Sequence, residues 1–231
     1  MNLWGDLNMV TKVRKKKRLP KRVYILRRIL VFILFVIFII GIFFAFIFFR
    51  QKYNERNSYR SIYNVELSKK ELSKFELDLD IQKSNFLWTE KLNYVNKPNR
   101  IIVHHSAKTG LTPQDINAMH KARGWAGIGY HFYIRKDGTI YEGRPTNAIG
   151  AHASNNNINT LGICLEGNFE EEKIEDIQLE SIIKLSTYLS LRYPIESMVR
   201  HGDVKNTLCP GKNIDVKDLE KRMINNIKTL G

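Results

Sequence analysis

The amino-acid sequence predicts an α/β fold, a central mixed β-sheet flanked by helices, preceded by one N-terminal transmembrane helix. Over residues 98–231, short apolar runs typical of buried strands alternate with segments that carry helix start and stop signals. Strands interleaved with helices are typical of a sheet covered by helices. Upstream, residues 29–49 form an apolar run broken only by Gly41. As a helix this run would be roughly 31 Å long, close to the hydrocarbon thickness of a bilayer.

The positive charge of the chain is concentrated around this apolar run. Residues 1–60 hold 14 of the 37 lysines and arginines but only 2 of the 23 acidic residues, which accounts for most of the formal net charge of +14. Ten basic residues precede the run and four follow it, so we expect the N-terminus in the cytoplasm and everything after Phe49 outside. Membrane topology and anionic lipid account for the basic block, and nucleic acid is not an expected partner.

The apolar run is expected to be an uncleaved signal-anchor. It is longer than the core of a usual signal peptide, and no clear small-x-small cleavage site follows it. A cleaved signal peptide is the alternative. The predicted organisation is a basic cytoplasmic tail, a transmembrane anchor, a stalk or linker, and a folded domain, with bounds 1–28, 29–49, 50–97 and 98–231.

Residues 50–97 are predicted to lift the domain off the membrane. The segment is polar, and its scattered leucine, phenylalanine and isoleucine residues fit neither the period of a helix nor that of a strand. We therefore expect a stalk with one short helix. Lys97-Pro98-Asn99 marks a turn at its end, just before the first strand of the domain.

The domain opens with a strand at 101–105 and a capped helix. Thr112 is placed to cap this helix, with Pro113 at its first position and Asp115 near its positive end, and Gly124 ends it. A hairpin with an Asp-Gly turn follows. The remaining elements are predicted in this order: hairpin strands at 130–135 and 140–142, a strand at 161–166, a long helix that stops before Pro194, a strand into His201, and a last helix from about 215 to 227.

The segment from Arg200 to Gly211 carries the strongest chemical signal. It has no hydrophobic period and holds a histidine, His201, and a cysteine, Cys209. Imidazole nitrogen and thiolate sulfur are common zinc ligands, and a loop of this length can fold both onto one ion. A further ligand is expected from the first strand, which ends in His104 and His105. Adjacent strand residues face opposite sides, so at most one of these two readily reaches the metal.

The two cysteines of the chain, Cys164 and Cys209, leave a second interpretation open. An exported pair is often a disulfide, which would remove the thiolate ligand. Against this, Cys164 lies inside an apolar strand and is expected to behave as a small buried hydrophobe. The spacing of Cys209 from His201 also favours a metal.

Six short motifs follow one another along the domain. They are Ile102-Val-His-His-Ser-Ala107, Gly124-Trp-Ala-Gly-Ile-Gly-Tyr-His-Phe132, Asp137-Gly-Thr-Ile-Tyr-Glu-Gly-Arg144, Gly150-Ala-His-Ala153, Leu161-Gly-Ile-Cys-Leu-Glu-Gly-Asn168, and His201-Gly-Asp with Cys209-Pro-Gly211. In this order they resemble the type 2 N-acetylmuramoyl-L-alanine amidases, the superfamily that includes phage lysozyme-type amidases and peptidoglycan recognition proteins. The resemblance covers about residues 98–231 and does not extend to the anchor or the stalk.

The resemblance implies a zinc amidase that cleaves the amide between N-acetylmuramic acid and the L-alanine of the stem peptide. Its ligands for one zinc ion map onto His104, His201 and Cys209, and three protein ligands leave a fourth position for water, which zinc activates. Tyr130 matches the family tyrosine of this region, and its phenol is expected to hydrogen-bond the water or the oxyanion. Some members carry lysine two residues before the cysteine. This chain has Thr207 there, as the recognition-protein branch does, and a hydroxyl donates a hydrogen bond without a positive charge.

Other residues of the motifs are assigned from their positions. Glu166, near a strand end, is predicted to be a general base, and a bond to a neighbouring backbone group or cation is the alternative. His152, Asn168 and Trp125 are predicted to contact substrate, with loop structure as the alternative for His152 and a core or cleft-wall position for Trp125. The remaining histidines are expected to be structural or to support the ligands: His105, His120 and His131.

The sequence therefore predicts a bacterial cell-envelope enzyme that acts on peptidoglycan or muropeptides from the outer face of the cytoplasmic membrane. A non-catalytic, membrane-anchored peptidoglycan-binding module is the alternative, because superfamily members that lose the cysteine ligand bind without cutting. This chain keeps all three ligands and the tyrosine, which favours catalysis. A membrane-anchored structural protein would fit residues 1–97 but would leave the metal-binding residues unexplained.

Overall fold

The computed structural model describes residues 20–230, so residues 1–19 of the predicted basic tail lie outside the described residues. The chain divides into two compact units, Met1–Arg50 and Gln51–Gly231. Helix α1 (Lys21–Asn57) begins in the first unit and contains the whole apolar run predicted at 29–49. By length and composition it is a candidate membrane span, and the large apolar side chains of that run are exposed.

The second unit is built on a five-stranded mixed sheet, which confirms the predicted fold class. Its strands are β1 (Arg100–His105), β2 (Phe132–Ile134), β3 (Ile140–Glu142), β4 (Thr160–Leu165) and β5 (Ser197–Arg200). The order across the sheet is β3-β2-β4-β1-β5. Strands β2, β4, β1 and β5 are parallel, and β3 is antiparallel to β2. The carboxyl ends of the four parallel strands lie at the same end of the sheet, where the predicted metal ligands are found.

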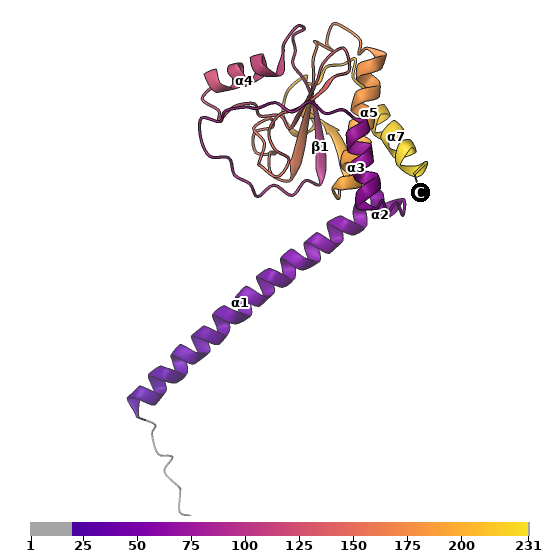
Figure 1. Ribbon diagram of the computed structural model, residues 1–231. Coiled ribbons are helices and arrows are strands. Elements are labelled where there is room, and N and C mark those ends of the chain that lie inside the picture. The colour runs from indigo at the N-terminus through magenta and orange to yellow at the C-terminus, as the bar shows by residue number, and fades with distance from the viewer. Residues whose placement is uncertain (1–19, 231) are drawn as a thin grey trace, which may run out of the picture. The chain divides into compact units, whose positions relative to one another are not determined.

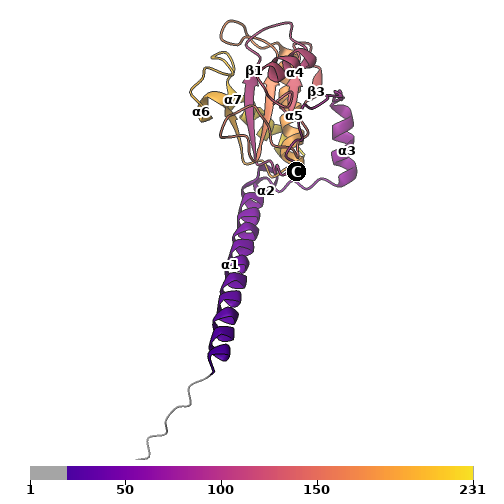
Figure 2. The ribbon, with the colours of Figure 1, turned by 90° about the vertical axis from the view of Figure 1, so that its left-hand side faces the viewer.

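Helices cover both faces of this sheet (Figures 1 and 2). Besides α1, the helices of the chain's described part are α2 (Tyr59–Ile62), α3 (Lys69–Asp78), α4 (Pro113–Ala122), α5 (Asp176–Arg192), α6 (His201–Val204) and α7 (Val216–Lys228). Helices α5 and α7 lie on one face, with α3 packed on α5, and α4 lies on the other side (Figure 1). The sheet is thus enclosed between layers of helices. Parallel strands are typically covered on both faces, which accounts for the burial of every residue of β4.

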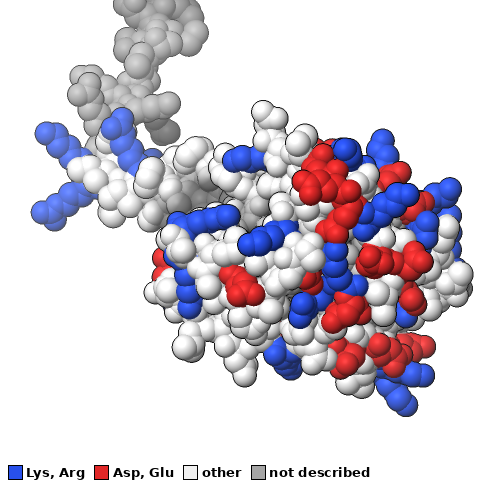
Figure 3. Space-filling model, turned by 90° about the horizontal axis from the view of Figure 1, so that it is seen from above, with Lys and Arg blue, Asp and Glu red and all other residues white. Residues whose placement is uncertain are grey.

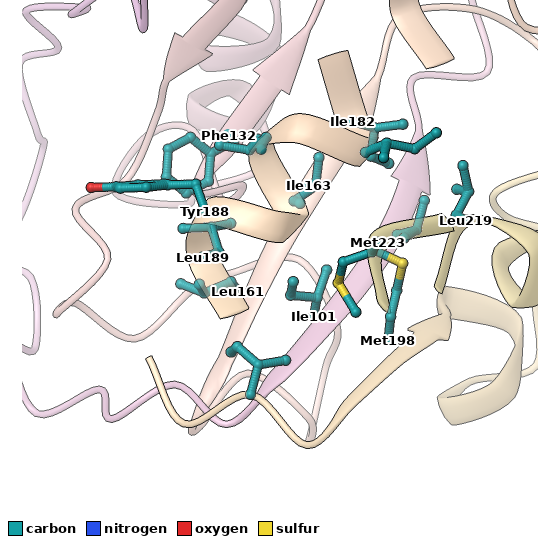
Figure 4. Close-up of a cluster of buried hydrophobic side chains, with 14 of the residues drawn as sticks. Ile101, Phe132, Leu161, Ile163, Ile182, Tyr188, Leu189, Met198, Leu219 and Met223 are labelled. Carbon is teal, nitrogen blue, oxygen red and sulfur yellow. The ribbon is translucent and has the colours of Figure 1, made fainter. Parts of the chain in front are cut away.

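The main hydrophobic core fills the space between the sheet and helices α5 and α7 (Figure 4). Ile101 of β1 and Leu161 and Ile163 of β4 point into it, because alternate strand residues share a face. Side chains from the helices close the layer: Ile182, Tyr188, Leu189, Leu219 and Met223. This core fixes β1 and β4 side by side.

The opposite face of the sheet is less apolar. His104 of β1 and Cys164 of β4 are direct neighbours in the register of these two strands, so they share a face. Cys164 belongs to a second, smaller cluster with Ile116, Ile128 and Tyr133. The histidine predicted to bind the metal is therefore held on a packed strand whose other face is the main core.

Helix α4 begins with the cap predicted from the sequence. The Thr112 hydroxyl accepts a hydrogen bond from the backbone N–H of Asp115, while the Asp115 carboxylate accepts from the Thr112 N–H, and Pro113 occupies the first turn. The helix ends at Ala122, and Gly124 follows with a φ of +80°. A left-handed residue just past a helix end favours glycine.

Residues 58–97, which we call the strap, pack on the domain, where the sequence predicted a stalk at 50–97. Their buried hydrophobic side chains are Tyr59, Val65, Leu79 and Leu92. Helix α3 packs on α5, where Phe75 stacks on Tyr188 with 6.1 Å between ring centroids. The apolar residues of the strap showed no regular period because they are buried singly against several different elements.

The strap also closes one edge of the sheet. Gln82 forms a bridge beside β3, where its backbone N–H donates to the Ile140 carbonyl at 2.8 Å and its carbonyl accepts from the Glu142 N–H at 2.9 Å. At the other edge, the Met198 N–H of β5 donates to the Glu220 carboxylate of α7 at 3.0 Å. Covered edges prevent the sheet from pairing with another chain.

Charges of both signs are interspersed on the surface of the folded unit seen from above (Figure 3). This face carries no large patch of basic side chains of the kind that binds a phosphate backbone. The distribution agrees with the near-neutral charge of the chain after residue 60.

Candidate metal centre and catalytic site

His104, His201 and Cys209 converge at the carboxyl ends of two neighbouring strands. His104 lies near the end of β1, His201 directly follows β5, and Cys209 lies in the loop after α6. Their ligand atoms all lie within 4.8 Å of one another, and Cys209 Sγ is 3.8 Å from His104 Nδ1. Because β1 and β5 are adjacent and parallel, His104 and His201 lie close together although 97 positions separate them in the sequence.

The donor set of this cluster fits zinc. It consists of two imidazoles and one thiol, a combination found in catalytic zinc sites that keep a fourth position open. The Nε2 of His201 is buried and has no hydrogen-bond partner among the described residues. A buried polar atom without a partner is costly unless something binds it, and a metal ion on this imidazole would satisfy that need.

The local environment keeps both imidazoles neutral. Burial lowers the pKa of His104 well below its ordinary value, and the neighbouring His201 adds to the shift. Burial also lowers the pKa of His201, with a further contribution from Lys205. Neutral imidazole is the form that binds a metal.

The thiol of Cys209 is buried as well. Burial raises its pKa to about 11, opposed by the backbone N–H of His105 and by Arg200. Without a metal the group is therefore a thiol, and metal binding has to displace its proton. Cys209 and Cys164 are both free cysteines in the structure. The disulfide between them, the second interpretation of the sequence, is therefore not formed.

Three hydrogen bonds hold the Cys209 loop against its surroundings. The His105 N–H donates to Cys209 Sγ at 3.4 Å, and the Gly202 N–H donates to the Cys209 carbonyl at 2.8 Å. The Cys209 N–H donates to the Thr207 hydroxyl at 3.3 Å. Thr207, predicted as a catalytic donor, thus supports the ligand loop and lies two residues from the sulfur.

Tyr130 lies beside the cluster, on the segment that leads into β2. Its ring centroid is 5.1 Å from that of His104. Burial raises the pKa of its phenol well above the ordinary value, so the group is neutral and can donate a hydrogen bond. The ring of Tyr130 thus lies beside the cluster, and its part in the reaction stays a prediction.

Glu166, predicted to be a general base, is held by structural hydrogen bonds. Its carboxylate is almost fully buried and accepts from the Gly110 N–H at 2.7 Å, from the Lys136 N–H at 3.2 Å and from Arg135 Nε at 3.0 Å. These three donors occupy three of the roughly four lone-pair positions of the carboxylate. It ties three segments together, as the alternative weighed from the sequence proposed.

The three predicted substrate contacts lie at different depths. Trp125 is partly exposed, and its ring stacks beside His120 with centroids 4.6 Å apart. Asn168 lies in a turn, where its side-chain oxygen accepts from the Glu170 N–H at 3.3 Å. His152 is buried behind His104, with 3.0 Å between His152 Nδ1 and His104 Nε2. Of these three, Trp125 is exposed and Asn168 is half-buried, whereas His152 has little surface open to a ligand.

Two other histidines have structural bonds. His131 accepts from the Gly162 N–H at Nδ1 and donates from Nε2 to the Ala148 carbonyl. His120 Nδ1 accepts from the Gly129 N–H at 2.9 Å. The direct bond between His152 and His104 is the feature that sequence reasoning missed, and the glycines at positions 150 and 162, which leave room for the His152 ring, were its only signal.

Comparisons with known proteins agree with this geometry. The family model described as N-acetylmuramoyl-L-alanine amidase matches residues 94–212. The endolysin of Enterobacteria phage T3 is 35% identical over 118 residues, which cover 48% of this chain and 78% of the endolysin. Peptidoglycan-recognition protein SC2 of Drosophila melanogaster is 35% identical over 138 residues, covering 54% of this chain and 75% of that protein.

A solved structure extends the likeness to the fold. The endolysin LysCS, an N-acetylmuramoyl-L-alanine amidase from Clostridium intestinale URNW, superposes with a TM-score of 0.61 at 48% sequence identity, over 62% of this chain and 94% of that one. The sequence match, the shared fold and the His-His-Cys cluster lead to one assignment. The chain belongs to the type 2 N-acetylmuramoyl-L-alanine amidase family, together with phage endolysins and peptidoglycan recognition proteins.

Proposed function

We propose that this protein is a zinc-dependent N-acetylmuramoyl-L-alanine amidase that hydrolyses the bond between N-acetylmuramic acid and the L-alanine of the stem peptide. Family membership and the endolysin relatives support a peptidoglycan amidase activity. The observation that carries the proposal is the convergence of His104, His201 and Cys209, the three residues that can hold the metal.

The protein's own residues have distinct parts in the proposed reaction. His104, His201 and Cys209 would hold the zinc, and their side chains come from positions fixed by β1, α6 and the Cys209 loop. Zinc bound there supplies Lewis-acid polarisation of the scissile carbonyl and a water of lowered pKa. Tyr130, as a neutral phenol, donates a hydrogen bond to the oxygen that gains negative charge.

Position 207 distinguishes this chain within the proposed mechanism. The Thr207 oxygen already accepts from the Cys209 N–H, and its proton remains available for donation. The hydroxyl brings no positive charge to the oxyanion. We therefore assign Thr207 to the support of the Cys209 loop and Tyr130 to hydrogen bonding at the reacting oxygen.

The proposed location is the outer face of the cytoplasmic membrane, with residues 29–49 as the anchor and the amidase domain on the cell-wall side. The length and composition of α1 support an anchor, and the ten basic residues before the run support this orientation. Protease protection in intact spheroplasts tests the topology. Digestion of the domain from outside is expected, and protection of the domain would contradict the orientation.

The test of the activity uses the full-length chain in detergent, loaded with zinc, and its Cys209→Ser variant. We expect about one zinc ion per native chain and release of free stem peptide from purified peptidoglycan. Both should be lost in Cys209→Ser. Cys164→Ala is the matched control for zinc content, because Cys164 is a buried strand residue outside the set of metal-binding residues.

The recognition proteins among the relatives supply the second candidate function, binding without cleavage. Native protein that carries zinc and retains peptidoglycan fragments without releasing peptide would favour that candidate. Absence of bound zinc from the native chain would contradict the metal-dependent proposal itself.

A further inference from the structure

The two ring nitrogens of His104 face different neighbours. Nδ1 lies on the side of Cys209, 3.8 Å from its sulfur, and Nε2 lies 3.0 Å from Nδ1 of His152. A neutral imidazole carries one proton, so the nitrogen that binds a metal must be the bare one. If Nδ1 is the ligand atom, the proton is on Nε2 and needs an acceptor on His152.

A chain of hydrogen bonds sets the direction of this contact. The Thr160 hydroxyl lies 3.0 Å from the carbonyl oxygens of Asn156 and Asn157, and carbonyls only accept. The hydroxyl proton is therefore used there, and the oxygen accepts from His152 Nε2 at 3.4 Å. With its proton on Nε2, His152 has a bare Nδ1 that accepts from Nε2–H of His104.

This direction leaves Nδ1 of His104 without a proton, on the side of Cys209. The reverse direction would place a proton on His152 Nδ1 and require Thr160 to donate to His152. Thr160 would then lose its bonds to both backbone carbonyls. The backbone of residues 156 and 157 thus favours one tautomer of His104 two side chains away.

The fold has a close-fitting slot for the His152 ring. A Cβ atom at Gly150 would lie 2.4 Å from His152 Cδ2, and one at Gly162 would lie 2.5 Å from His152 Cγ. Gly162 is on the same face of the sheet as His104, because the paired residues Ile102 and Gly162 precede the pair His104 and Cys164 by two positions. Only glycine at these two positions leaves room for the imidazole.

The backbone around His152 is fixed as well. The N–H groups of His152 and Ala153 both donate to the Asn157 side-chain oxygen, at 2.9 Å and 2.8 Å. The His152 side chain is almost fully buried. It therefore contacts a metal-binding residue while having little surface left for a substrate.

We propose that His152 is a positioning residue that fixes the tautomer and ring orientation of His104, so that Nδ1 of His104 is presented to the metal. This inference rests on the proposed zinc site and replaces the substrate contact predicted from the sequence. Removal of a group that supports a metal-binding histidine typically lowers metal affinity by about 10- to 100-fold.

Two variants distinguish loss of the hydrogen-bond acceptor at position 152 from loss of the imidazole ring itself. In His152→Asn the side-chain oxygen takes the approximate place of Nδ1 and can still accept from His104. In His152→Ala the acceptor is lost. We expect zinc affinity of the full-length chain, measured by competition with a chromogenic chelator, to fall by about 10- to 100-fold in His152→Ala and by much less in His152→Asn.

A second measurement reports the tautomer without metal or activity. Long-range ¹H–¹⁵N spectra of the metal-free chain labelled at histidine should show His104 protonated at Nε2 in the native protein. The same spectra should show a mixture of tautomers in His152→Ala. Thr160→Val, which removes the hydroxyl at almost constant volume, should shift His104 in the same direction and keeps the test available if His152→Ala does not fold.

The results that would overturn the role of His152 differ from those that would overturn the proposed zinc-dependent activity. A folded His152→Ala chain with native zinc affinity would overturn the inference. So would a native His104 protonated at Nδ1. Loss of peptidoglycan binding at unchanged zinc affinity would make His152 a substrate contact instead. A native chain that does not bind zinc would defeat the proposed function, whereas the spectra would still decide whether His152 sets the tautomer of His104.

Discussion

The backbone N–H of His105 donates a hydrogen bond to the sulfur of Cys209, with 3.4 Å between the two atoms. Strand β1 thus contributes twice to the candidate metal centre, through the His104 side chain and through the next backbone amide. A hydrogen bond to sulfur favours the thiolate over the thiol. The geometry of the cluster is therefore fixed by a strand whose other face is buried in the main core.

Zinc should stabilise the folded domain through this cluster. A ligand that binds only the folded state at 1,000 times its dissociation constant adds about 4 kcal/mol to the free energy of unfolding. We expect a shift of this order in urea unfolding when zinc replaces a chelator. The shift should be absent in Cys209→Ser and present in Cys164→Ala, and an equal shift in both variants would contradict binding at Cys209.

Tyr130→Phe should impair catalysis and leave metal binding intact. The phenol can donate to the oxygen that becomes charged, and loss of one such donor typically lowers kcat by about 10²- to 10³-fold. The measurement is peptide release alongside zinc content. Tyr133→Phe is the matched control, because its hydroxyl donates to the Leu111 carbonyl at 2.8 Å and should matter to stability alone. Equal activity of native chain and Tyr130→Phe would remove Tyr130 from the mechanism.

Glu166→Gln should destabilise the domain without changing the chemistry. The substitution removes a buried charge that pairs with Arg135 and accepts from two backbone amides, and we expect a loss of about 1 to 3 kcal/mol, since Arg135 is partly exposed. Urea unfolding measures the loss, and peptide release per folded molecule should stay at the native level.

The comparison for Glu166 is Glu180→Gln, which breaks an exposed pair with Lys184. That change should cost less than about 1 kcal/mol. Loss of peptide release in folded Glu166→Gln would restore the general-base role that the sequence suggested.

Acid should destabilise the metal-free domain through His131. Burial lowers the pKa of His131 from 6.5 to about 4. Between these values the unfolded chain binds more protons, so the stability contributed by the neutral ring is complete above about pH 6.5 and is lost as the pH falls toward 4. The free energy of unfolding should be about 2 kcal/mol lower at pH 5 than at pH 7.5 from this group.

The variant His131→Asn isolates this effect. The asparagine oxygen can still accept from the Gly162 N–H, but the side chain does not titrate. The variant should be less stable than the native chain at pH 7.5 and should lose about 2 kcal/mol less on acidification. His120, whose pKa is also lowered to about 4 by burial, remains in both chains and cancels in the comparison. Identical pH dependence of the two chains would show that His131 does not titrate as described.

The sequence predicted those features that depend on local patterns. The cap at Thr112, the mixed sheet and the family each follow from short motifs whose residue types have one physical reason to occur together. The apolar runs around His104 and Cys164 predicted a strand at each position, and the register of β1 and β4 places these two residues side by side. His104, His201 and Cys209 were chosen for their ligand chemistry, and the fold brings them together.

The features that were missed depend on contacts between distant segments. The strap has no regular apolar period, so nothing in its sequence distinguishes burial against α5 from exposure in a stalk. Glu166 and His152 are both polar residues in family motifs, and only the fold shows that one binds three loop donors and the other lies behind His104. Side-chain orientation in loops cannot be inferred from spacing along the chain.

The two backbone hydrogen bonds between Gln82 and β3 limit how far the domain could be shortened before fusion to another protein. The matched family region begins at residue 94, but a fusion joined there would leave the β3 edge unpaired and would lose the buried side chains of Tyr59, Val65 and Leu79. An open sheet edge beside exposed apolar surface invites aggregation. The smallest exchangeable module of this amidase therefore starts near Ser58, about 36 residues before its recognisable family boundary.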